Sequence, residues 1–363
     1  MNASHRLAMR LLMIGFDGLQ LPAHVAQWID AGLGGVILFR RNIETLEQLI
    51  ALNGEVLGRG QALMLGVDEE GGRVRRLRGI TSDLPAMAQI GATEDPKLAY
   101  RCGALLGREL AALGFSINFA PILDVHTNPD NPVIGDRAFA TTPDAVARMA
   151  LPFAKGLQDM GVAACGKHFP GHGDTDTDSH LALPVLDHDE HRLASIELAP
   201  FRQAATSDIA SMMTAHVVIK AYNEEHPSTL DGRALSILRR QYRYPGVIIS
   251  DDLEMAAIAD RYSMAEAIER GLHAGVDLFL VCRAQERVEQ SIEAVCRLAE
   301  NPKSAALVAA AARRVENMIK RYVGRPGKPN LGDAKRILRA VPLPEAIGMA
   351  RAGHDPTETA DRV

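Results

Sequence analysis

GVIISD, residues 246–251, is a short apolar run that ends in a carboxylate, and it is one of eight short apolar runs spaced along the chain. The runs are nearly continuous in hydrophobicity instead of alternating between apolar and polar residues. This pattern is typical of strands that are buried on both faces of a parallel sheet. The other seven runs are 9–16 (MRLLMIGF), 34–40, 62–68 (ALMLGVD), 115–124 (FSINFAPILD), 161–168, 209–216 (IASMMTAH) and 275–282 (GVDLFLVC).

Helical patterns occupy the segments between the apolar runs. Examples are residues 44–57, 96–113 and 144–160. The second of these opens with Asp95 and Pro96, a common way to start a helix. Eight strands that each precede a helix predict the α/β class and a (β/α)8 TIM barrel, because a doubly wound sheet usually has fewer strands. The chain of 363 residues is long enough for one such barrel.

Polar side chains follow most of the predicted strands. In a barrel of this kind, catalytic groups lie where each strand ends and the loop to the next helix begins. Six of the eight strand ends carry a charged or imidazole side chain, which predicts an active site at that end of the barrel. These residues are Asp17, Asp68, Asp124, Lys167, His168, His216, Asp251 and Asp252.

The charge balance and the apolar runs limit the possible partners and location. Lys and Arg number 40 against 45 Asp and Glu, for a net charge of −5, and the longest basic block is RVRRLR at 73–78. The sequence therefore argues against nucleic acid and favours a small neutral or anionic ligand. No apolar run is long enough to span a membrane, and the N-terminus lacks the apolar core of a signal peptide. We expect a soluble, cytoplasmic protein without membrane partners.

The cysteines fit a reducing compartment. They form no CxxC pair and lie in apolar stretches, which indicates reduced, buried thiols and neither a disulfide framework nor a zinc site. The four residues are Cys102, Cys165, Cys282 and Cys296.

The pattern of strands and helices ends near residue 323. We therefore predict a barrel domain over 1–323 and a C-terminal extension over 324–363 that is packed or partly disordered. The extension opens with a turn cluster rich in proline and glycine, and a short helix is expected over 333–340.

The loop after the fifth predicted strand, GKHFPGHGDTDTDSH at 166–180, has the highest density of reactive side chains. One interpretation is a solvated surface loop, since Gly and Asp favour turns. A phosphate-binding loop is disfavoured, because His168 follows the GxxxxGK match at 161–167 where Ser or Thr is required.

Metal binding is a second interpretation of this loop, because imidazole and carboxylate are metal ligands. A calcium loop is disfavoured, since Ser179 and Val185 stand where Gly and Glu are needed. The alternative function that follows is a metal-dependent TIM-barrel hydrolase acting on an amide or phosphoester. Its ligands would come from His168, His172, His180, Asp174, Asp176 and Asp178.

Acid–base catalysis is the interpretation that we favour. Asp178 and His180 are two residues apart, so in a turn the carboxylate can fix the tautomer of the imidazole and stabilise its charged form. An imidazole with an ordinary pKa can donate and then accept a proton near neutral pH. The best candidate nucleophile is Asp251, whereas Asp252 is expected to cap the next helix.

Four motifs together resemble the family 3 glycoside hydrolases, specifically the one-domain bacterial β-N-acetylglucosaminidases of the NagZ type. They occur in order within about residues 10–320, and the KHFPGHG segment with the DSH that follows it is the most specific. The motifs are VDEEGGRVRRL at 67–77, VIGDRAF at 133–139, KHFPGHGDTDTDSH at 167–180 and ISDDLEM at 249–255.

The resemblance implies a TIM barrel that retains the anomeric configuration, needs no metal or other cofactor, and releases terminal β-linked N-acetylglucosamine from muropeptides during cytoplasmic cell-wall recycling. It implies that Asp251 is the nucleophile and that His180, assisted by Asp178, is the general acid/base. A carboxylate can accept hydrogen bonds from two adjacent sugar hydroxyls, and Arg and Lys donate to hydroxyl oxygens. The positions that match the family's sugar-binding residues are Asp68, Arg76, Arg137, Lys167 and His168.

Some properties stay open at this point. Wider relatives carry a second domain that supplies a carboxylic acid, so we expect the acid of this chain to lie within the barrel. We expect a monomer, since the sequence has no exposed heptad pattern. The sequence leaves open the aglycone, the selectivity for the acetamido group, and water against phosphate as acceptor. A catalytically inactive sugar-binding barrel is a third possible function, which would place Asp251 outside the pocket.

Overall fold

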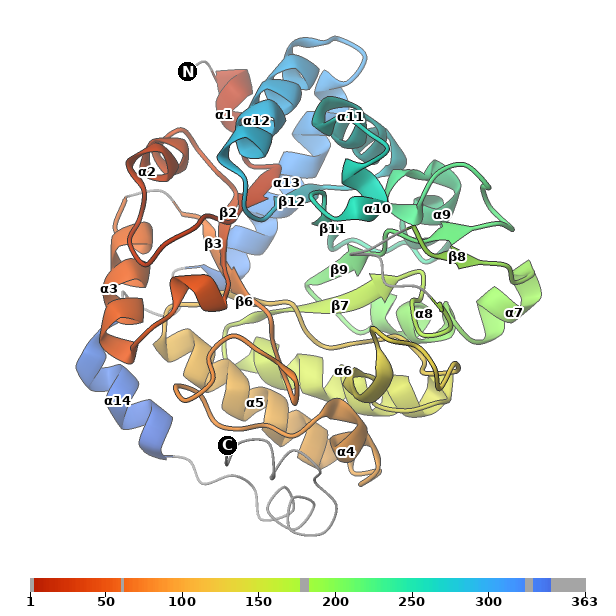
Figure 1. Cartoon of the computed structure of the whole chain (residues 1–363), viewed down its shortest axis with the longest axis horizontal. Helices are drawn as coiled ribbons and strands as arrows, with labels where there is room; N and C mark the ends of the chain where they lie inside the picture. The colour runs from red at the N-terminus through yellow and green to blue at the C-terminus, as the bar shows by residue number, and fades with distance from the viewer. Residues whose placement is uncertain (1–2, 60–61, 177–182, 324–328, 341–363) are drawn as a thin grey trace.

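Eight parallel strands close into a barrel in the computed structural model, which describes residues 3–59, 62–176, 183–323 and 329–340 (Figure 1). The order around the barrel is β1-β12-β11-β9-β7-β6-β3-β2. The predicted (β/α)8 barrel is therefore confirmed. The barrel strands are β1 (Leu12–Ile14), β2 (Gly35–Leu38), β3 (Met64–Val67), β6 (Ile117–Asn118), β7 (Ala163–Phe169), β9 (Ser211–Thr214), β11 (Val247–Asp252) and β12 (Leu278–Val281).

Each of the eight apolar runs contains or overlaps one barrel strand. The strands are short, and almost every strand residue is buried, as expected for strands covered on both faces. In β11 the pairing with β12 shifts between Ile249 and Asp252, which marks an irregularity at the end of that strand. This irregularity lies at the predicted nucleophile, Asp251.

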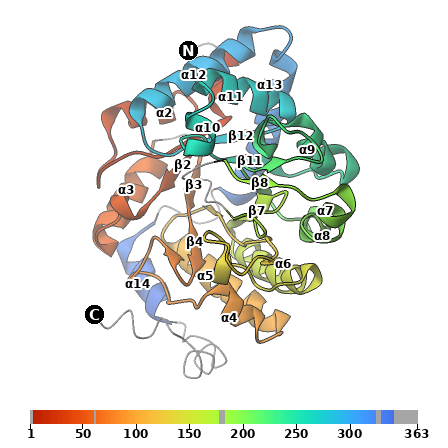
Figure 2. The same ribbon diagram turned by 45° about the vertical axis from the view of Figure 1, so that its right-hand side comes forward.

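Helices surround the barrel as an outer layer (Figures 1 and 2). The predicted helices over 44–57, 96–113 and 144–160 are confirmed as α3, α5 and α6, and Asp95 caps α5 by accepting the amide N–H of Lys97 at 2.8 Å. The helices are α1 (Ala3–Met9), α2 (Ala23–Asp30), α3 (Leu46–Leu57), α4 (Met87–Gly91), α5 (Pro96–Ala112), α6 (Pro143–Asp159), α7 (Glu190–Ser195), α8 (Ala199–Ala205), α9 (Gly232–Ser236), α10 (Ala256–Ala259), α11 (Met264–Ala274), α12 (Gln285–Glu300), α13 (Ala305–Tyr322) and α14 (Leu331–Ala340). Short turns of helix are η1 (Arg40–Asn42), η2 (Gly135–Arg137), η3 (Ser228–Leu230) and the π-helical η4 (Ile237–Gln241).

The interior of the barrel is a packed apolar core and not a pore. Side chains from the strands, among them Met13, Phe119 and Ile249, form one buried cluster. Met318 and Tyr322 of α13 belong to the same cluster, so α13 covers the amino-terminal end of the barrel. Burial of this cluster leaves the carboxyl ends of the strands as the open end.

Two small sheets lie beside the barrel strands. β4 (Glu69–Gly71) and β5 (Val74–Arg75) form an antiparallel pair directly after β3. β8 (Val185–Leu186) and β10 (Val218–Ile219) form a parallel pair in the loops that follow β7 and β9. Both pairs shape the loops on the side of the barrel where the predicted catalytic residues lie.

The expected short helix near residues 333–340 is confirmed as α14. It packs on α3 and α5, with Ala334 fully buried and the Nζ of Lys335 at 2.6 Å from a carboxylate oxygen of Glu47. Residues 341–363 lie outside the described part of the chain, and the domain boundary at 323 stays a prediction.

All four cysteines have free thiols, and Cys102, Cys165 and Cys282 are buried. Burial raises the pKa of Cys102 and of Cys165 to about 12, so both thiols are protonated at neutral pH. Within the described ranges, no helix combines the length and the apolar character needed to cross a membrane.

Candidate active site

A cavity of about 240 Å³ lies at the carboxyl ends of the barrel strands. It is lined by side chains from β2, β7, β9, β11 and β12 and from segments that follow the strands, above all the segment after β3. Six of the eight predicted site residues line it: Asp68, Arg76, Arg137, Lys167, His168 and Asp251. The other two, Asp178 and His180, lie outside the described residues.

Asp251 is a partly buried carboxylate near the end of β11. Burial alone would raise its pKa, but the positive charges of His216, His168 and Lys167 and the amide N–H of Asp252 hold the pKa below its usual value. Asp251 is therefore ionised at neutral pH. A carboxylate of this kind can act as a nucleophile or stabilise a positive charge.

Four charged side chains form a buried network on the opposite wall. Lys167 Nζ lies 2.8 Å from an oxygen of Asp68 and 2.7 Å from an oxygen of Glu70. Arg137 donates from Nε and Nη2 to the two oxygens of Glu70, both at 2.9 Å. Asp68 and Arg137 are partly exposed, whereas Lys167 and Glu70 are buried, and the second oxygen of Asp68 is available to a ligand in the cavity.

Glu70 lies at the centre of this network, although no role was predicted for it from the sequence. Its carboxylate is 2 % exposed, and the charges of Arg137 and Lys167 overcome burial and hold its pKa far below the usual range. Two basic side chains are thus fixed in the cavity by one fully ionised acid. The signal in the sequence was the DEE triplet after β3, in which the carboxylate two residues after Asp68 returns to the same side of the extended chain.

Asp124 orients His168 from below the cavity. Its oxygens accept hydrogen bonds from the backbone N–H groups of His168 and His172, and Oδ2 lies 2.8 Å from Nδ1 of His168. Although Asp124 is fully buried, the two histidines lower its pKa, so it is a carboxylate and Nδ1 is the donor. This leaves Nε2 of His168 as the ring nitrogen available to a ligand.

The first part of the long loop after β7 is firmly attached to the barrel. Nδ1 of His172 lies 2.6 Å from the hydroxyl of Thr175, and burial together with the charge of His168 lowers the pKa of His172 to about 4. Asn131 donates to the carbonyl oxygens of His172 and Thr175 at 2.8 and 2.9 Å. Asp174 accepts the hydroxyl of Thr127 at 2.6 Å. The segment that leads to Asp178 and His180 is therefore anchored up to Thr175.

The expectation that Asp252 caps the next helix is wrong. Asp252 is the last residue of β11, and α10 begins only at Ala256 with Met255 as its N-cap residue. Oδ1 of Asp252 accepts the amide N–H groups of Glu254 at 3.0 Å and Cys282 at 3.2 Å, and its side chain lines the cavity. Consecutive strand residues normally point to opposite faces, so the irregular pairing of β11 accounts for both aspartates lining one cavity.

Asp252 differs from Asp251 in its ionisation. Burial, helped by the nearby charges of Glu254 and Asp251, raises the pKa of Asp252 to about 7. Asp251 is thus ionised at pH 7, whereas Asp252 is mostly protonated when the pH is below about 7.

Phe39 and Arg76 also line the cavity, and Arg41 packs on the Phe39 ring. The guanidinium groups of Arg41 and Arg76 lie 4.4 and 5.9 Å from the centre of the Phe39 ring. Nε of Arg76 is buried and has no hydrogen-bond partner among the described residues. Phe39 directly follows β2 and was not predicted, because an apolar residue at a strand end does not stand out in the sequence.

The metal-site interpretation rests partly on residues that the structure does not describe. His168 and His172 lie side by side, with ring centres 6.0 Å apart, and each already has a hydrogen-bond partner at Nδ1. Among the described residues, no group of three or more His, Cys, Asp or Glu side chains is arranged to hold a metal ion.

Comparison with known sequences identifies the fold and chemistry of related proteins. Residues 9–318 match the family described as "Glycosyl hydrolase family 3 N terminal domain". A β-hexosaminidase of Alkalilimnicola ehrlichii is 36 % identical over 355 residues, which cover 95 % of this chain and 97 % of the relative. A β-hexosaminidase of Thiobacillus denitrificans is 40 % identical over 268 residues, which cover 72 % of this chain and 74 % of the relative.

Solved structures of family 3 enzymes are also similar to this chain. A family 3 β-N-acetylglucosaminidase from Paenibacillus superposes with a TM-score of 0.85 at 35 % identity, covering 93 % of this chain and 68 % of that one. NagZ from Neisseria gonorrhoeae, solved in complex with N-trifluoroacetyl-D-glucosamine, superposes with a TM-score of 0.77 at 32 % identity. That match covers 94 % of this chain and 97 % of the other.

Proposed function

The chain belongs to glycosyl hydrolase family 3 and is a β-N-acetylhexosaminidase, and from that premise we propose that it is a retaining exo-β-N-acetylglucosaminidase with Asp251 as nucleophile. The observation that supports this assignment best is the state of Asp251. It is an ionised carboxylate in a small cavity at the carboxyl ends of the strands, faced by a fixed set of hydrogen-bonding groups.

The sugar-binding step uses the groups that the cavity already orders. Asp68, held by Lys167, accepts hydrogen bonds from sugar hydroxyl groups. Lys167 and Nε2 of His168 lie where they can form hydrogen bonds with neighbouring hydroxyl groups. Arg137 and Arg76 supply further donors on the same wall. Since these side chains are positioned before substrate arrives, little ordering is needed when the sugar binds.

In the first chemical step, a carboxylate oxygen of Asp251 attacks the anomeric carbon, and the bond to the leaving group breaks with inversion. His180 donates a proton to the departing oxygen. In the second step His180 accepts a proton from water, whose oxygen attacks the anomeric carbon; the bond to Asp251 breaks, the carboxylate is released, and the original configuration is restored. Asp178 holds the imidazole tautomer and stabilises its protonated form.

The roles of Asp178 and His180 are supported by the DSH sequence and by the anchored segment that precedes it. Thr127, Asn131 and Asp124 attach residues 172–175 beside the cavity, only a few residues before His180. An imidazole acid adds no permanent negative charge near Asp251, and such a charge would raise the pKa of the nucleophile.

For the substrate, we propose GlcNAc-1,6-anhydroMurNAc muropeptides, which places the enzyme in cytoplasmic peptidoglycan recycling as a monomer. The support is the resemblance carried by the KHFPGHG and DSH segments, and the cavity of about 240 Å³, which suits one terminal sugar. The aglycone would then extend past Phe39 and Arg76, which line the cavity.

The first test is nitrophenol release from nitrophenyl β-N-acetylglucosaminide and β-glucoside, each with and without EDTA. We expect selective cleavage of the N-acetyl substrate, unchanged by the chelator. Activity that EDTA abolishes would favour the alternative metal-dependent hydrolase. No cleavage of either substrate would favour a barrel that only binds sugar.

Variants then separate the two catalytic roles. Asp251→Ala should abolish turnover while N-acetylglucosamine still protects the protein from thermal unfolding. His180→Gly should slow substrates with poor leaving groups much more than activated nitrophenyl substrates, because only the former need a proton in the first step. Equal losses for both substrate types would contradict the role of His180 as proton donor.

A further inference from the structure

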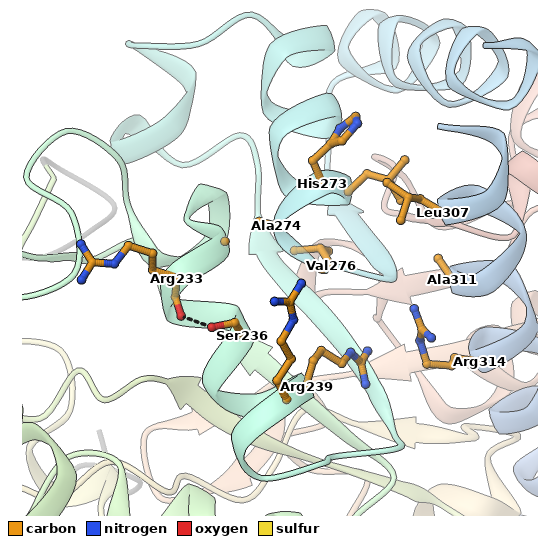
Figure 3. A pocket seen from close by; sticks show the side chains of 13 residues that line it. Arg233, Ser236, Arg239, His273, Ala274, Val276, Leu307, Ala311 and Arg314 are labelled. Carbon is orange, nitrogen blue, oxygen red and sulfur yellow. Dashed lines mark hydrogen bonds between the residues drawn. The ribbon is translucent and has the colours of Figure 1, made fainter. Parts of the chain in front are cut away.

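A second cavity, of about 450 Å³, lies at the other end of the barrel from the active site. It is bounded by η4, by the turn from α11 into β12, and by one face of α13 (Figure 3). These segments precede or cover the beginnings of β11 and β12, whereas the active-site residues lie at the ends of the strands. The volume is in the range of small-molecule sites.

The lining of this cavity is basic, although the whole chain has a net charge of −5. It includes Arg239, Arg240, Arg314 and His273, and among the described residues that line it there is no Asp or Glu. Here the cations outnumber the carboxylates available to them.

One buried carboxylate lies behind the cavity and fixes two of the arginines. Asp277 accepts Nε of Arg314 at 2.8 Å and Nη2 of Arg239, and it also accepts the backbone N–H of Ile248 at 2.9 Å. Asp277 is fully buried, so it balances one of the two charges without entering the cavity. The guanidinium of Arg314 is thereby held in one orientation.

Several donors remain unused by the protein. Within the described part of the chain, Arg314 forms hydrogen bonds only through Nε, and Arg240 forms no hydrogen bond or ion pair. Nε of Arg239 is buried and also lacks an acceptor there. Arg233 differs, because its side chain points away from the cavity and donates to the carbonyl of Tyr222 (Figure 3). The N–H groups of arginine match the oxygens of a phosphate in spacing and charge.

An apolar wall adjoins these donors. Leu307 and Ala311 lie on α13 one turn apart, and Arg314 follows on the same face, with Val276 nearby (Figure 3). Leu307 is 38 % exposed, and in the described residues only two other large apolar side chains, Leu19 at 36 % and Val185 at 43 %, are exposed to a similar extent. An exposed leucine beside arginines that keep free N–H donors suits a ligand with one anionic and one apolar part.

We propose that this cavity binds a small phosphate monoester, with the phosphate on Arg314 and Arg240 and its organic group on Leu307. The site is separate from the sugar-binding cavity. Arg314 and Arg240 contribute most of the binding free energy because they form charge-assisted hydrogen bonds. Leu307 favours an ester over free phosphate by removing apolar surface from water.

Calorimetric titration of the full chain with phenyl phosphate tests the site, with saturating N-acetylglucosamine present to fill the active site. We expect one-to-one binding that is tighter than the binding of inorganic phosphate. Arg240→Gln should raise the Kd about tenfold or more, which corresponds to one charged hydrogen bond. Arg313→Gln is the matched control, because Arg313 is exposed on the same helix and does not line the cavity.

Two further readouts keep the test decisive. Leu307→Ser should weaken phenyl phosphate binding and leave inorganic phosphate binding unchanged, and Arg240→Gln should retain full hydrolysis of the nitrophenyl substrate, which shows that it is folded. The proposal is overturned if phenyl phosphate does not bind, if Arg240→Gln and Arg313→Gln bind it equally, or if it binds only when N-acetylglucosamine is left out. Equal affinity for phenyl phosphate and inorganic phosphate would overturn the assignment to an ester.

Discussion

Asp252→Asn should change how the stability of the protein depends on pH. The carboxyl of Asp252 accepts the amide N–H groups of Glu254 and Cys282 through one oxygen, Oδ1. The side-chain oxygen of asparagine can keep both bonds, so the variant removes the ionisable group and leaves the local hydrogen bonds in place.

The magnitude follows from the raised pKa of this group. The pKa of Asp252 is about 7 in the folded protein against an ordinary 3.8, and each tenfold change in proton affinity corresponds to about 1.4 kcal/mol. The neutral form is favoured by folding, so the folded state holds the proton when the unfolded state has already lost it. Stability from this group is present below about pH 4 and is lost as the pH rises to about 7. The full loss is about 4 kcal/mol, of which about 2 to 3 kcal/mol falls between pH 5 and pH 8.

Urea unfolding of the wild type and of Asp252→Asn at pH 5, 6, 7 and 8 measures the effect, with the fluorescence of the single tryptophan, Trp28, as the probe. The stability of the variant relative to the wild type should rise with pH and level off above pH 7. Asp260→Asn, which replaces an exposed carboxylate shortly after the site, is the control and should show no such trend. The reasoning is refuted if the difference between Asp252→Asn and wild type is the same at pH 5 and pH 8.

Three other substitutions test the groups around the cavity. Glu70→Gln leaves two buried cations without their shared anion, so we expect a loss of about 3 to 5 kcal/mol in urea unfolding together with lower kcat/KM; unchanged stability would contradict the network. Asp124→Asn frees the ring of His168, and misplacing a sugar-contacting group should lower kcat/KM by up to about 100-fold, an expectation that fails if only thermal stability changes. Gly173→Ala would place a methyl group 1.8 Å from the carbonyl oxygen of Val125, so the loop must move. We expect a large loss of kcat and only a small change in the unfolding midpoint. A variant with the kcat of the wild type would show that the loop position is unimportant.

The fold could be predicted from the sequence because its signal is local and repeated. Each barrel strand is a short apolar run such as 209–216, and each is followed by polar residues and a helix. Buried parallel strands need apolar residues on both faces, so the composition of every run carries the same information. The boundaries were less certain, since β6 covers only Ile117–Asn118 within the longer run 115–124.

The site was only partly predictable, because hydrogen bonds between distant segments decide the state of each group. The sequence indicated that Asp68, Lys167 and Asp251 follow strands, but it could not show that Glu70 lies between two cations from other loops. It also led to the wrong role for Asp252, because the irregular end of β11 does not show in the order of residues.

These partners explain how one cavity can hold several carboxyl groups in different states. Glu70 is ionised because two basic side chains surround it, and Asp251 is ionised because histidine and lysine charges outweigh its burial. No basic side chain among the described residues lowers the pKa of Asp252, so its carboxyl retains its proton up to about pH 7. A neutral Asp252 leaves Asp251 as the only anionic member of this pair of neighbouring aspartates. On the proposed mechanism this keeps the nucleophile anionic, because a second charge next to it would favour protonation. If His180 is the acid, as proposed, an imidazole in place of a carboxylate serves the same end.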